Sequence, residues 1–116
     1  MKKIIVAGGR DFSNYKLLAS KLDIFLSSCP DAIIVSGMAK GADQLAIRYA
    51  KEKGLFLSQW PADWDKHGNS AGFRRNAEMA HFADACVCFW DGKSVGTKHM
   101  IETAKAKNLD IRIVKY

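Results

Sequence analysis

Short, mostly apolar runs alternate with longer amphipathic segments from one end of the chain to the other. Apolar residues that recur every three or four positions predict helices, whereas short continuous apolar runs bounded by glycine, proline or polar residues predict strands. The runs are nearly continuous rather than alternating, which is typical of strands buried on both faces of a parallel sheet. The predicted strands cover residues 3–8, 32–37, 55–60, 84–90 and 110–116, and the predicted helices cover a segment from Ser13 or Asn14 to Pro30, then 38–54, 73–83 and 96–108.

This order of elements predicts an α/β fold. A strand, a helix and the next strand form a right-handed crossover, and a series of such units gives a parallel sheet covered on both faces. A chain of 116 residues suits one domain. We therefore expect a single Rossmann-like doubly wound domain over residues 1–116, with five mainly parallel strands and helices on both faces. The 12-residue connection 61–72 is long for so small a domain, and long connections are often functional.

Composition narrows the class of protein. The chain is 48% hydrophobic and 26% charged, as in ordinary globular domains, and no apolar stretch approaches the length of a membrane span. Its basic start precedes an apolar run, Ile4 to Ala7, that is shorter than the core of a signal peptide, so we expect a cytoplasmic protein without a membrane partner. The 3 cysteines, an odd number, argue against a disulfide framework and form no metal-ligand spacing with the histidines. We expect buried structural cysteines, no metal and no cofactor.

The net charge of +6 favours anionic ligands. The Lys and Arg residues are scattered along the chain, without a tract or a stripe on one helix. An ordinary lysine-rich surface therefore explains the charge at least as well as nucleic-acid binding does.

Eight of the 9 glycines fall in the connections that follow the predicted strands. In a doubly wound fold, ligands bind beyond the carboxyl ends of the strands, where glycine lets N–H groups approach a phosphate and helix N-termini favour an anion. Standard nucleotide motifs do not fit, because no G-x-G-x-x-G follows the first strand and Val87 stands where a Walker A motif needs glycine. The candidate ligand-binding residues in these connections are Gly8, Gly9, Arg10, Ser36, Gly37, Gly41, Asp43, Trp64, Arg74, Arg75, Gly92, Ser94, Gly96 and Thr97.

Several of these residues have a structural alternative. Arg10 could fork onto a phosphate or pair with Asp11. Trp64 could stack on a base or pack the long connection down. Asp43 could cap a helix or bind a ribose or base. Arg75 and its arginine neighbour are expected in the first turn of a helix, where cations oppose the helix dipole and a bound anion would compensate for them.

Four segments together resemble the YspA-like branch of the SLOG superfamily: GGRDF at 8–12, SGMAKGAD at 36–43, PADWDKHGNSAGFRRNAEM at 61–79 and WDGKSVGT at 90–97. They occur in the order of that family and span nearly the whole chain. The superfamily includes the cytokinin-activating LOG phosphoribohydrolases, the Rossmann core of the DNA-processing protein DprA, and nucleotide-sensing domains of antiviral systems. The resemblance implies a Rossmann-like fold, a homodimer or higher homo-oligomer, and a pocket for a nucleotide or a nucleotide-derived signal.

The LOG enzymes carry an R-K-x-x-M segment and a later P-G-G-x-G-T-x-x-E loop. Arg75 and Asn76 are similar to the start of the first motif, with asparagine in place of lysine, and this adds Asn76 to the candidate ligand-binding residues. Residues 90–97 are similar to the second motif, but His99 and Met100 follow where the LOG enzymes have their glutamate. The chain thus resembles the binding part of these enzymes more closely than their catalytic part.

Three functions compete at this stage. The first is the binding, by a sensor or sequestering protein, of a nucleotide or nucleotide-derived signal through the glycine-rich connections. The second is hydrolysis of the N-glycosidic bond of nucleoside 5′-monophosphates, in which Arg75 would orient the substrate and Asp63, Asp65 or Glu78 would act as acid or base. The third is binding of single-stranded nucleic acid, as in the DprA core, which the unpatterned charge makes the least favoured of the three.

Overall fold

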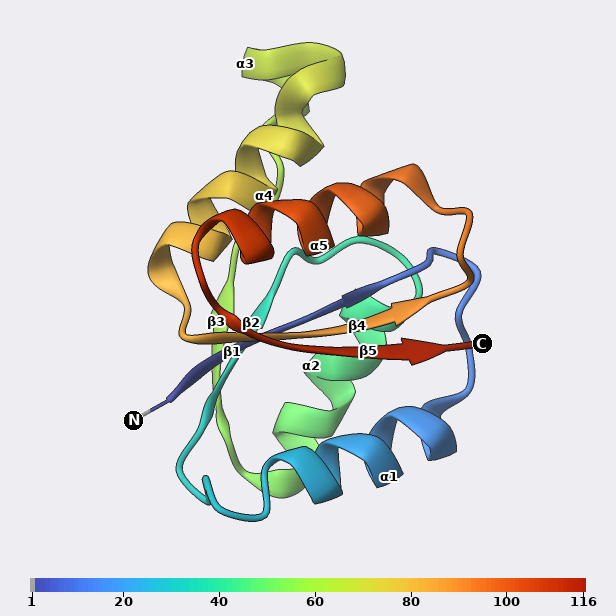
Figure 1. The fold of residues 1–116 in the computed structure, drawn as a ribbon, viewed down its shortest axis with the longest axis vertical. Helices are drawn as coiled ribbons and strands as arrows, with labels where there is room; N and C mark the ends of the chain where they lie inside the picture. The colour runs from blue at the N-terminus through green and yellow to red at the C-terminus, as the bar shows by residue number, and fades with distance from the viewer. Residues whose placement is uncertain (1) are drawn as a thin grey trace.

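The computed structural model describes residues 2–116, which form a five-stranded sheet with helices on both faces (Figure 1). The strand order is β3-β2-β1-β4-β5, and all four pairings are parallel. The predicted Rossmann-like α/β fold is confirmed. In chain order the elements are β1 (Lys3–Gly8), α1 (Tyr15–Phe25), β2 (Ile33–Ser36), α2 (Ala42–Lys53), β3 (Phe56–Gln59), α3 (Trp64–His67), the 3₁₀ turn η1 (Gly68–Ser70), α4 (Ala71–Phe82), β4 (Ala85–Trp90), α5 (Val95–Ala106) and β5 (Asp110–Lys115).

Each face of the sheet has its own apolar core. Helices α1 and α2 cover one face and α4 and α5 cover the other, and Figure 1 shows the two pairs on opposite sides of the strands. The side chains of β4 alternate between the cores. Val87 and Phe89 pack with α1 and α2, whereas Cys86 and Cys88 pack with α4 and α5. This burial on both sides explains why the strands read as continuous apolar runs.

The cysteines belong to the packing of the fold. Cys86 and Cys88 are buried with their Sγ atoms 3.4 Å apart, and Cys29 is half-buried. The contact with the Cys88 thiol, together with burial, raises the pKa of Cys86 well above its ordinary value. A thiol in this environment stays protonated and is a poor nucleophile. None of the three is in a disulfide within residues 2–116.

The long connection 61–72 contains structure that the sequence pattern did not predict. Helix α3 and the η1 turn fill most of it, and α4 begins at Ala71, two residues before the predicted start. Helix α3 begins after Asp63, whose side chain accepts a hydrogen bond from the Lys66 N–H at 3.1 Å. A four-residue helix is too short to produce an apolar period, which is why the pattern missed it. Neither α3 nor η1 contains a buried residue, and the segment projects beyond the sheet (Figure 1).

Two other helices begin away from their predicted positions. Helix α2 begins at Ala42 instead of residue 38, because the chain first passes through a turn in which Met38 and Gly41 have positive φ. Helix α5 begins at Val95, one residue early, because Ser94 caps it. Within residues 2–116, none of these helices is long and apolar enough to cross a membrane.

Candidate functional site

A cleft opens at the carboxyl ends of the strands, where the connections after β1, β2, β3 and β4 meet. We call it the main cleft. Its volume is about 440 Å³, within the range of small-molecule binding sites. Parallel strands bring all their carboxyl ends to one edge of the sheet, so residues far apart in sequence meet there. The candidate residues that line the main cleft are Gly8, Gly9, Arg10, Asp43, Trp64, Arg75, Asn76, Ser94, Gly96 and Thr97.

A second, smaller hollow of about 280 Å³ adjoins the main cleft, and we call it the side hollow. Its wall runs from Gly37 to Lys40 after β2 and includes Pro61 and Ala62 after β3. Residues that line both spaces form the junction between them, and these are Arg10, Ala39, Trp64 and Arg75.

Four candidate residues lie outside both spaces, namely Ser36, Gly41, Arg74 and Gly92. The Ser36 hydroxyl is buried and donates to the main-chain carbonyl of Asp43 at 3.0 Å. Gly41 and Gly92 have positive φ, the first as N-cap of α2 and the second in the turn after β4. The Arg74 side chain donates to the Ser70 hydroxyl instead of pointing into the cleft. Ser36, Gly41 and Gly92 therefore line neither space, but they set the conformation of the loops that do.

The carboxylates predicted as acid or base lie away from the main cleft. Asp63 caps α3, Asp65 is exposed on that helix, and Glu78 lines a separate groove on the outer side of α4. The carboxylates that do line the main cleft are Asp11, Asp43 and Asp91. No group of three or more His, Cys, Asp and Glu side chains within residues 2–116 is arranged to hold a metal ion.

Neutral acceptors hold Arg75 at the junction of the main cleft and the side hollow. Its Nη1 donates to the Gly37 carbonyl at 2.5 Å, and its Nε donates to Asn76 Oδ1 at 3.1 Å. A Cβ on Gly37 would lie 2.7 Å from Arg75 Nη1 and 2.9 Å from Asp43 Oδ2, so this close approach requires glycine. Burial lowers the pKa of Arg75, while the nearby Asp43 carboxylate opposes that shift. The guanidinium remains a cation in any case.

Asp43 is the buried carboxyl group of the main cleft. It is 5% exposed, and its Oδ2 accepts a hydrogen bond from the Ala39 N–H at 3.2 Å. Burial raises its pKa to about 6, although that N–H and the guanidinium groups of Arg75 and Arg10 act in the opposite direction. The alternative role of Asp43 as a helix cap is not observed, because Gly41 is the N-cap of α2 and no side chain caps this helix.

Arg10 is exposed and forms no salt bridge within residues 2–116. Asp11, its alternative partner, instead accepts a hydrogen bond from the Tyr116 hydroxyl at 2.7 Å. The Tyr116 ring also packs against Phe12, with ring centroids 4.7 Å apart. The Arg10 guanidinium is therefore available to an anion at the junction.

The start of α5 has fewer free N–H groups than its sequence suggests. The Ser94 hydroxyl oxygen accepts the Thr97 N–H at 3.4 Å and lies 3.1 Å from the Thr97 hydroxyl. Asp91 Oδ1 accepts the N–H groups of Lys93 and Ser94, each at 2.8 Å, and these bonds hold the pKa of Asp91 below its ordinary value. This wall of the cleft thus carries a carboxylate, and it offers a ligand the N–H of Gly96 rather than that of Thr97.

Asn76 ties α4 to α5 beneath the cleft. Its Nδ2 lies 3.4 Å from the Gly96 carbonyl oxygen and 3.2 Å from His99 Nδ1. The His99 ring in turn stacks on Phe73, with centroids 4.1 Å apart and planes 10° apart. Burial lowers the pKa of His99, while Glu102 opposes the shift. The neutral imidazole is therefore favoured, and it helps to fix the position of Phe73 at the mouth of the cleft.

Sequence reasoning did not single out several residues that line the main cleft, among them Asn69, Phe73, Asp91 and Met100. The Asp91–Gly92 pair directly after a strand is a turn signal that could have found Asp91. Asn69 belongs to η1, which the pattern missed. Phe73 and Met100 have no sequence signal, because apolar residues in a helix are expected to pack in the core.

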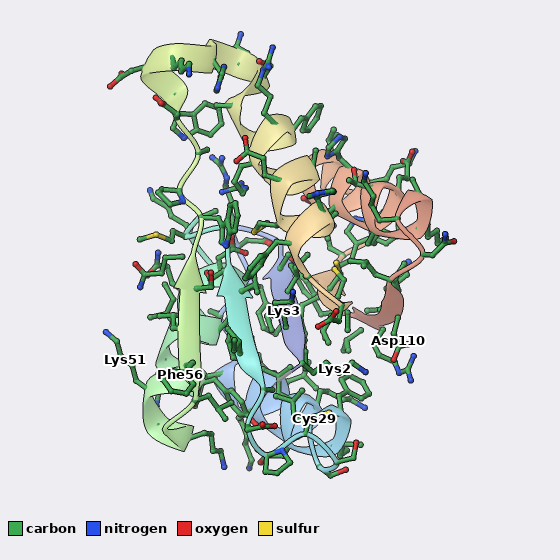
Figure 2. All side chains as sticks on the ribbon, turned by 90° about the vertical axis from the view of Figure 1, so that its left-hand side faces the viewer. Lys2, Lys3, Cys29, Lys51, Phe56 and Asp110 are labelled. Carbon is green, nitrogen blue, oxygen red and sulfur yellow. The ribbon has the colours of Figure 1, made fainter. Side chains whose placement is uncertain are left out.

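A third groove is larger than the main cleft, at about 680 Å³, but more open and mostly apolar. It lies beside α4 and is lined by Lys3, Trp60, Phe82 and their neighbours. Figure 2 views this side of the molecule and labels Lys3 on β1 and Phe56 on β3. The main cleft is more enclosed and more polar, with two arginines and three aspartates in its wall, so it is the better candidate for a small polar ligand.

Comparisons with known proteins agree on the family. The sequence model of the YspA, cpYpsA-related SLOG family matches residues 2–67. The Gene 61 protein of Mycobacterium phage D29 is 32% identical over 118 aligned residues, which cover 96% of this chain and 94% of that protein.

Solved structures with the same fold include two DNA processing proteins A (DprA). The Streptococcus pneumoniae structure matches 97% of this chain with a TM-score of 0.75 and 19% identity. The structure of the Helicobacter pylori protein, which binds single-stranded DNA, matches 97% with a TM-score of 0.71 and 19% identity. This chain spans 49% of the first of these chains and 64% of the second, and at such identity the likeness concerns the fold.

Proposed function

The chain belongs to the YspA, cpYpsA-related SLOG family, and from that premise we propose that it binds a nucleotide or a nucleotide-derived signal in the main cleft. It would act as a sensor or a sequestering protein. The observation that carries the proposal is the pair of guanidinium groups, Arg10 and Arg75, at the junction of the main cleft and the side hollow. Neither forms a salt bridge within residues 2–116.

The surroundings of these two cations suit a phosphate. Each guanidinium can donate to phosphate oxygens in fork geometry, and a partly buried position strengthens such bonds. Gly8, Gly9 and Gly96 line the same cleft, and glycine at the first two positions lets Phe89 and Tyr116 pack closely against this wall. Trp64 and Phe73 are 50% and 44% exposed at the cleft, and either ring can stack on a base.

Calorimetric titration with AMP, CMP, GMP and UMP tests the proposal. We expect binding by at least one of them and a loss of affinity of about tenfold or more in an Arg10→Ala variant, because a charge-assisted hydrogen bond contributes roughly 1.5–3 kcal/mol. Arg10 makes no hydrogen bond to other described residues, so its removal should leave the fold intact. The absence of binding by any nucleotide at millimolar concentration would refute the proposal.

Arg74→Ala is the matched control. It removes the same charge from α4, but the Arg74 side chain lies outside both spaces and donates to Ser70. We expect its affinity to stay within about twofold of wild type, since an exposed charge outside the site is screened by salt. Equal losses in Arg10→Ala and Arg74→Ala would point to a general charge effect and against a specific phosphate site.

A second candidate function is hydrolysis of the N-glycosidic bond of a nucleoside 5′-monophosphate, and Asp43 favours it. In this reaction the C1′–N bond breaks, the hydroxyl of water joins C1′, and a proton goes to the leaving base. A buried carboxyl with a pKa of about 6 is suited to exchange that proton near neutral pH. Asp43 would then take the role expected of Asp63, Asp65 or Glu78.

The hydrolase candidate is tested by chromatography of monophosphates incubated with the protein. Release of free base and ribose 5-phosphate by wild type, with a loss of about a hundredfold or more in Asp43→Asn, would support it, since general acid–base catalysis typically contributes about 10²–10⁴-fold. Asp63→Asn serves as control, because asparagine can keep the cap of α3. Nucleotide binding without base release would leave binding as the function.

A third candidate is binding of single-stranded DNA, suggested by the Helicobacter pylori DprA structure of the same fold. Trp64 and Phe73 could stack on successive bases. Fluorescence anisotropy with a labelled oligonucleotide at increasing salt tests it. Specific binding predicts retained affinity at physiological salt and a loss in Trp64→Ala, whereas an interaction seen at low salt alone would be non-specific attraction by the +6 charge.

A further inference from the structure

The main cleft and the side hollow adjoin, and Arg10, Trp64 and Arg75 line both. A molecule bound in the main cleft that extends past these side chains would therefore enter the side hollow. Their volumes are about 440 and 280 Å³. A molecule of one nucleoside and one phosphate needs only one such compartment, and the second would remain unused.

The two compartments differ in chemistry. The main cleft is lined by the carboxylates Asp11, Asp43 and Asp91 as well as by cations. The side hollow is lined by no acidic residue, and its wall combines the Lys40 ammonium group with the apolar surfaces of Met38, Ala62 and Pro61. The carboxylates of the main cleft can accept hydrogen bonds from the hydroxyl and amino groups of a nucleoside. The side hollow combines a cation with apolar side chains, so it suits a second group that is joined to the nucleoside through a negatively charged linker.

The wall of the side hollow is held in a fixed conformation by side chains behind it. Met38 has a φ of 65°, a conformation that is uncommon for a residue with a side chain. Its N–H donates to the Ser36 hydroxyl at 3.2 Å, and its carbonyl accepts from Gln44 Nε2 at 2.9 Å. The next N–H, of Ala39, donates to the buried Asp43. Such backbone strain persists only where surrounding bonds impose it, and it is concentrated at ligand sites.

We propose that the ligand is a two-part nucleotide, in which a second group attached through a diphosphate occupies the side hollow. The inference rests on nucleotide binding in the main cleft and specifies the class of nucleotide. The nucleoside lies in the main cleft, and the diphosphate crosses the junction between Arg10 and Arg75. The second group lies beyond Trp64, against Met38, Pro61 and Ala62.

Matched pairs of probes separate the two compartments: AMP with ADP-ribose, GMP with GDP-mannose, and UMP with UDP-glucose. Calorimetry of wild type should give, for at least one pair, an affinity at least about tenfold higher for the two-part molecule, which is about 1.4 kcal/mol of added contact. The variant Ala62→Phe fills the side hollow, whose wall Ala62 forms without lining the main cleft. It should abolish this increase while leaving the affinity for the monophosphate unchanged.

Ala106→Phe is the matched control, because Ala106 is exposed at the end of α5 and lines neither compartment. It should retain the full increase. Equal affinities for both members of every pair in wild type, or equal losses for both in Ala62→Phe, would overturn the two-part ligand while nucleotide binding stands. A failure of all six probes, and of CMP as well, would refute nucleotide binding itself. Affinity that keeps rising from a dinucleotide to a decanucleotide would also overturn the proposal, in favour of a track for single-stranded DNA.

Discussion

Asp43 combines three features at the centre of the main cleft: burial, a hydrogen bond from the Ala39 N–H, and two guanidinium groups nearby. Burial dominates and makes the neutral carboxyl more favourable than it is in water. The same residue also holds the loop that walls the side hollow. Asp43 therefore links the stability of the fold to the shape of the site.

The raised pKa of Asp43 predicts a pH-dependent stability. Between the unfolded value of 3.8 and the folded value of about 6, the folded state binds more protons, so the free energy of unfolding falls as pH rises through this window. The full effect is about 3 kcal/mol above the window. Asp43→Asn removes the cost of the buried charge and can still accept the Ala39 N–H. It should exceed wild type in stability by about 1–3 kcal/mol at pH 7.5 and by less at pH 5.

Urea unfolding of both proteins at these two pH values measures the difference. The difference between variant and wild type is the informative quantity, because Asp91, Asp23 and Glu52 have lowered pKa values and contribute the opposite trend at acid pH. An Asp43→Asn protein that is less stable than wild type by the same amount at both pH values would show that the ionised carboxylate is a net stabilising partner of Arg75.

At the residue scale, the sequence predicts which types of residue gather at the cleft but not their pairings. Arg10 and the glycines after each strand could be predicted, because parallel strands bring these positions to one edge. The bond between Tyr116 and Asp11 joins residues 105 positions apart, and no local pattern encodes it. The close approach of Arg75 to Gly37 depends on where α4 crosses the sheet, and only the three-dimensional structure gives that.

The first turn of α5 and the turn before it leave few main-chain N–H groups free to bind a phosphate. Ser94 caps the helix, and the Asp91 side chain closes the turn before it. Both use N–H groups that a phosphate would otherwise need. The resemblance of this turn to a phosphate-binding loop is therefore only partial, and the cations at the junction are the stronger site for a phosphate.

Replacing either of two glycines at helix ends by alanine should change the stability of the protein, but in opposite directions. A Cβ at Gly96, in the first turn of α5, would have no other atom within 4 Å, and the same holds at Gly54, the C-cap of α2. Gly54 has a φ of 67°, which is strained for other residues, whereas Gly96 has helical conformation. We expect Gly96→Ala to stabilise the protein by about 0.5–1 kcal/mol and Gly54→Ala to destabilise it by about 1–2 kcal/mol. Thermal or urea unfolding measures both, and shifts in the same direction would contradict the backbone argument.

At the element scale, the sequence predicts the strands and long helices well and the connections poorly. Apolar periodicity over three turns is a strong signal, and each of the four predicted helices exists. Helix α3 and η1 are stabilised by one cap and by contact with α4, so their sequence carries little signal. The start of α2 was predicted four residues early, because Met38 and Ala39 look helical by composition while Ser36 and Asp43 hold them in a turn.

At the scale of the whole molecule, the apolar cores that stabilise the fold lie apart from the candidate binding site. The two cores lie along the length of the sheet on its two faces, whereas the main cleft lies at the carboxyl ends of the strands. Leu22 of α1 is fully buried in one core and lines neither the main cleft nor the side hollow. A change there affects folding without changing a group that lines the site.

The oligomeric state is a further property of the whole molecule, and we predict a homo-oligomer. A single chain has a mass of 12.9 kDa, so light scattering during gel filtration separates a monomer from larger assemblies. The resemblance to the SLOG superfamily predicts twice that mass or more. Phe56 of β3 is 67% exposed and is an apolar side chain that such an assembly could cover (Figure 2). A mass of 12.9 kDa at all protein concentrations would contradict the prediction.

The central claim, that a nucleotide binds in the main cleft, is tested most directly by ¹H–¹⁵N spectra recorded during titration with the nucleotide that binds most tightly. We predict shifts concentrated on the amides of Gly8, Gly9 and Gly96 and on the Arg10 and Arg75 guanidinium signals. The amides of Lys3 and Phe82, beside the apolar groove, should remain unchanged. Shifts confined to the groove, or no shifts at saturating nucleotide, would contradict the claim.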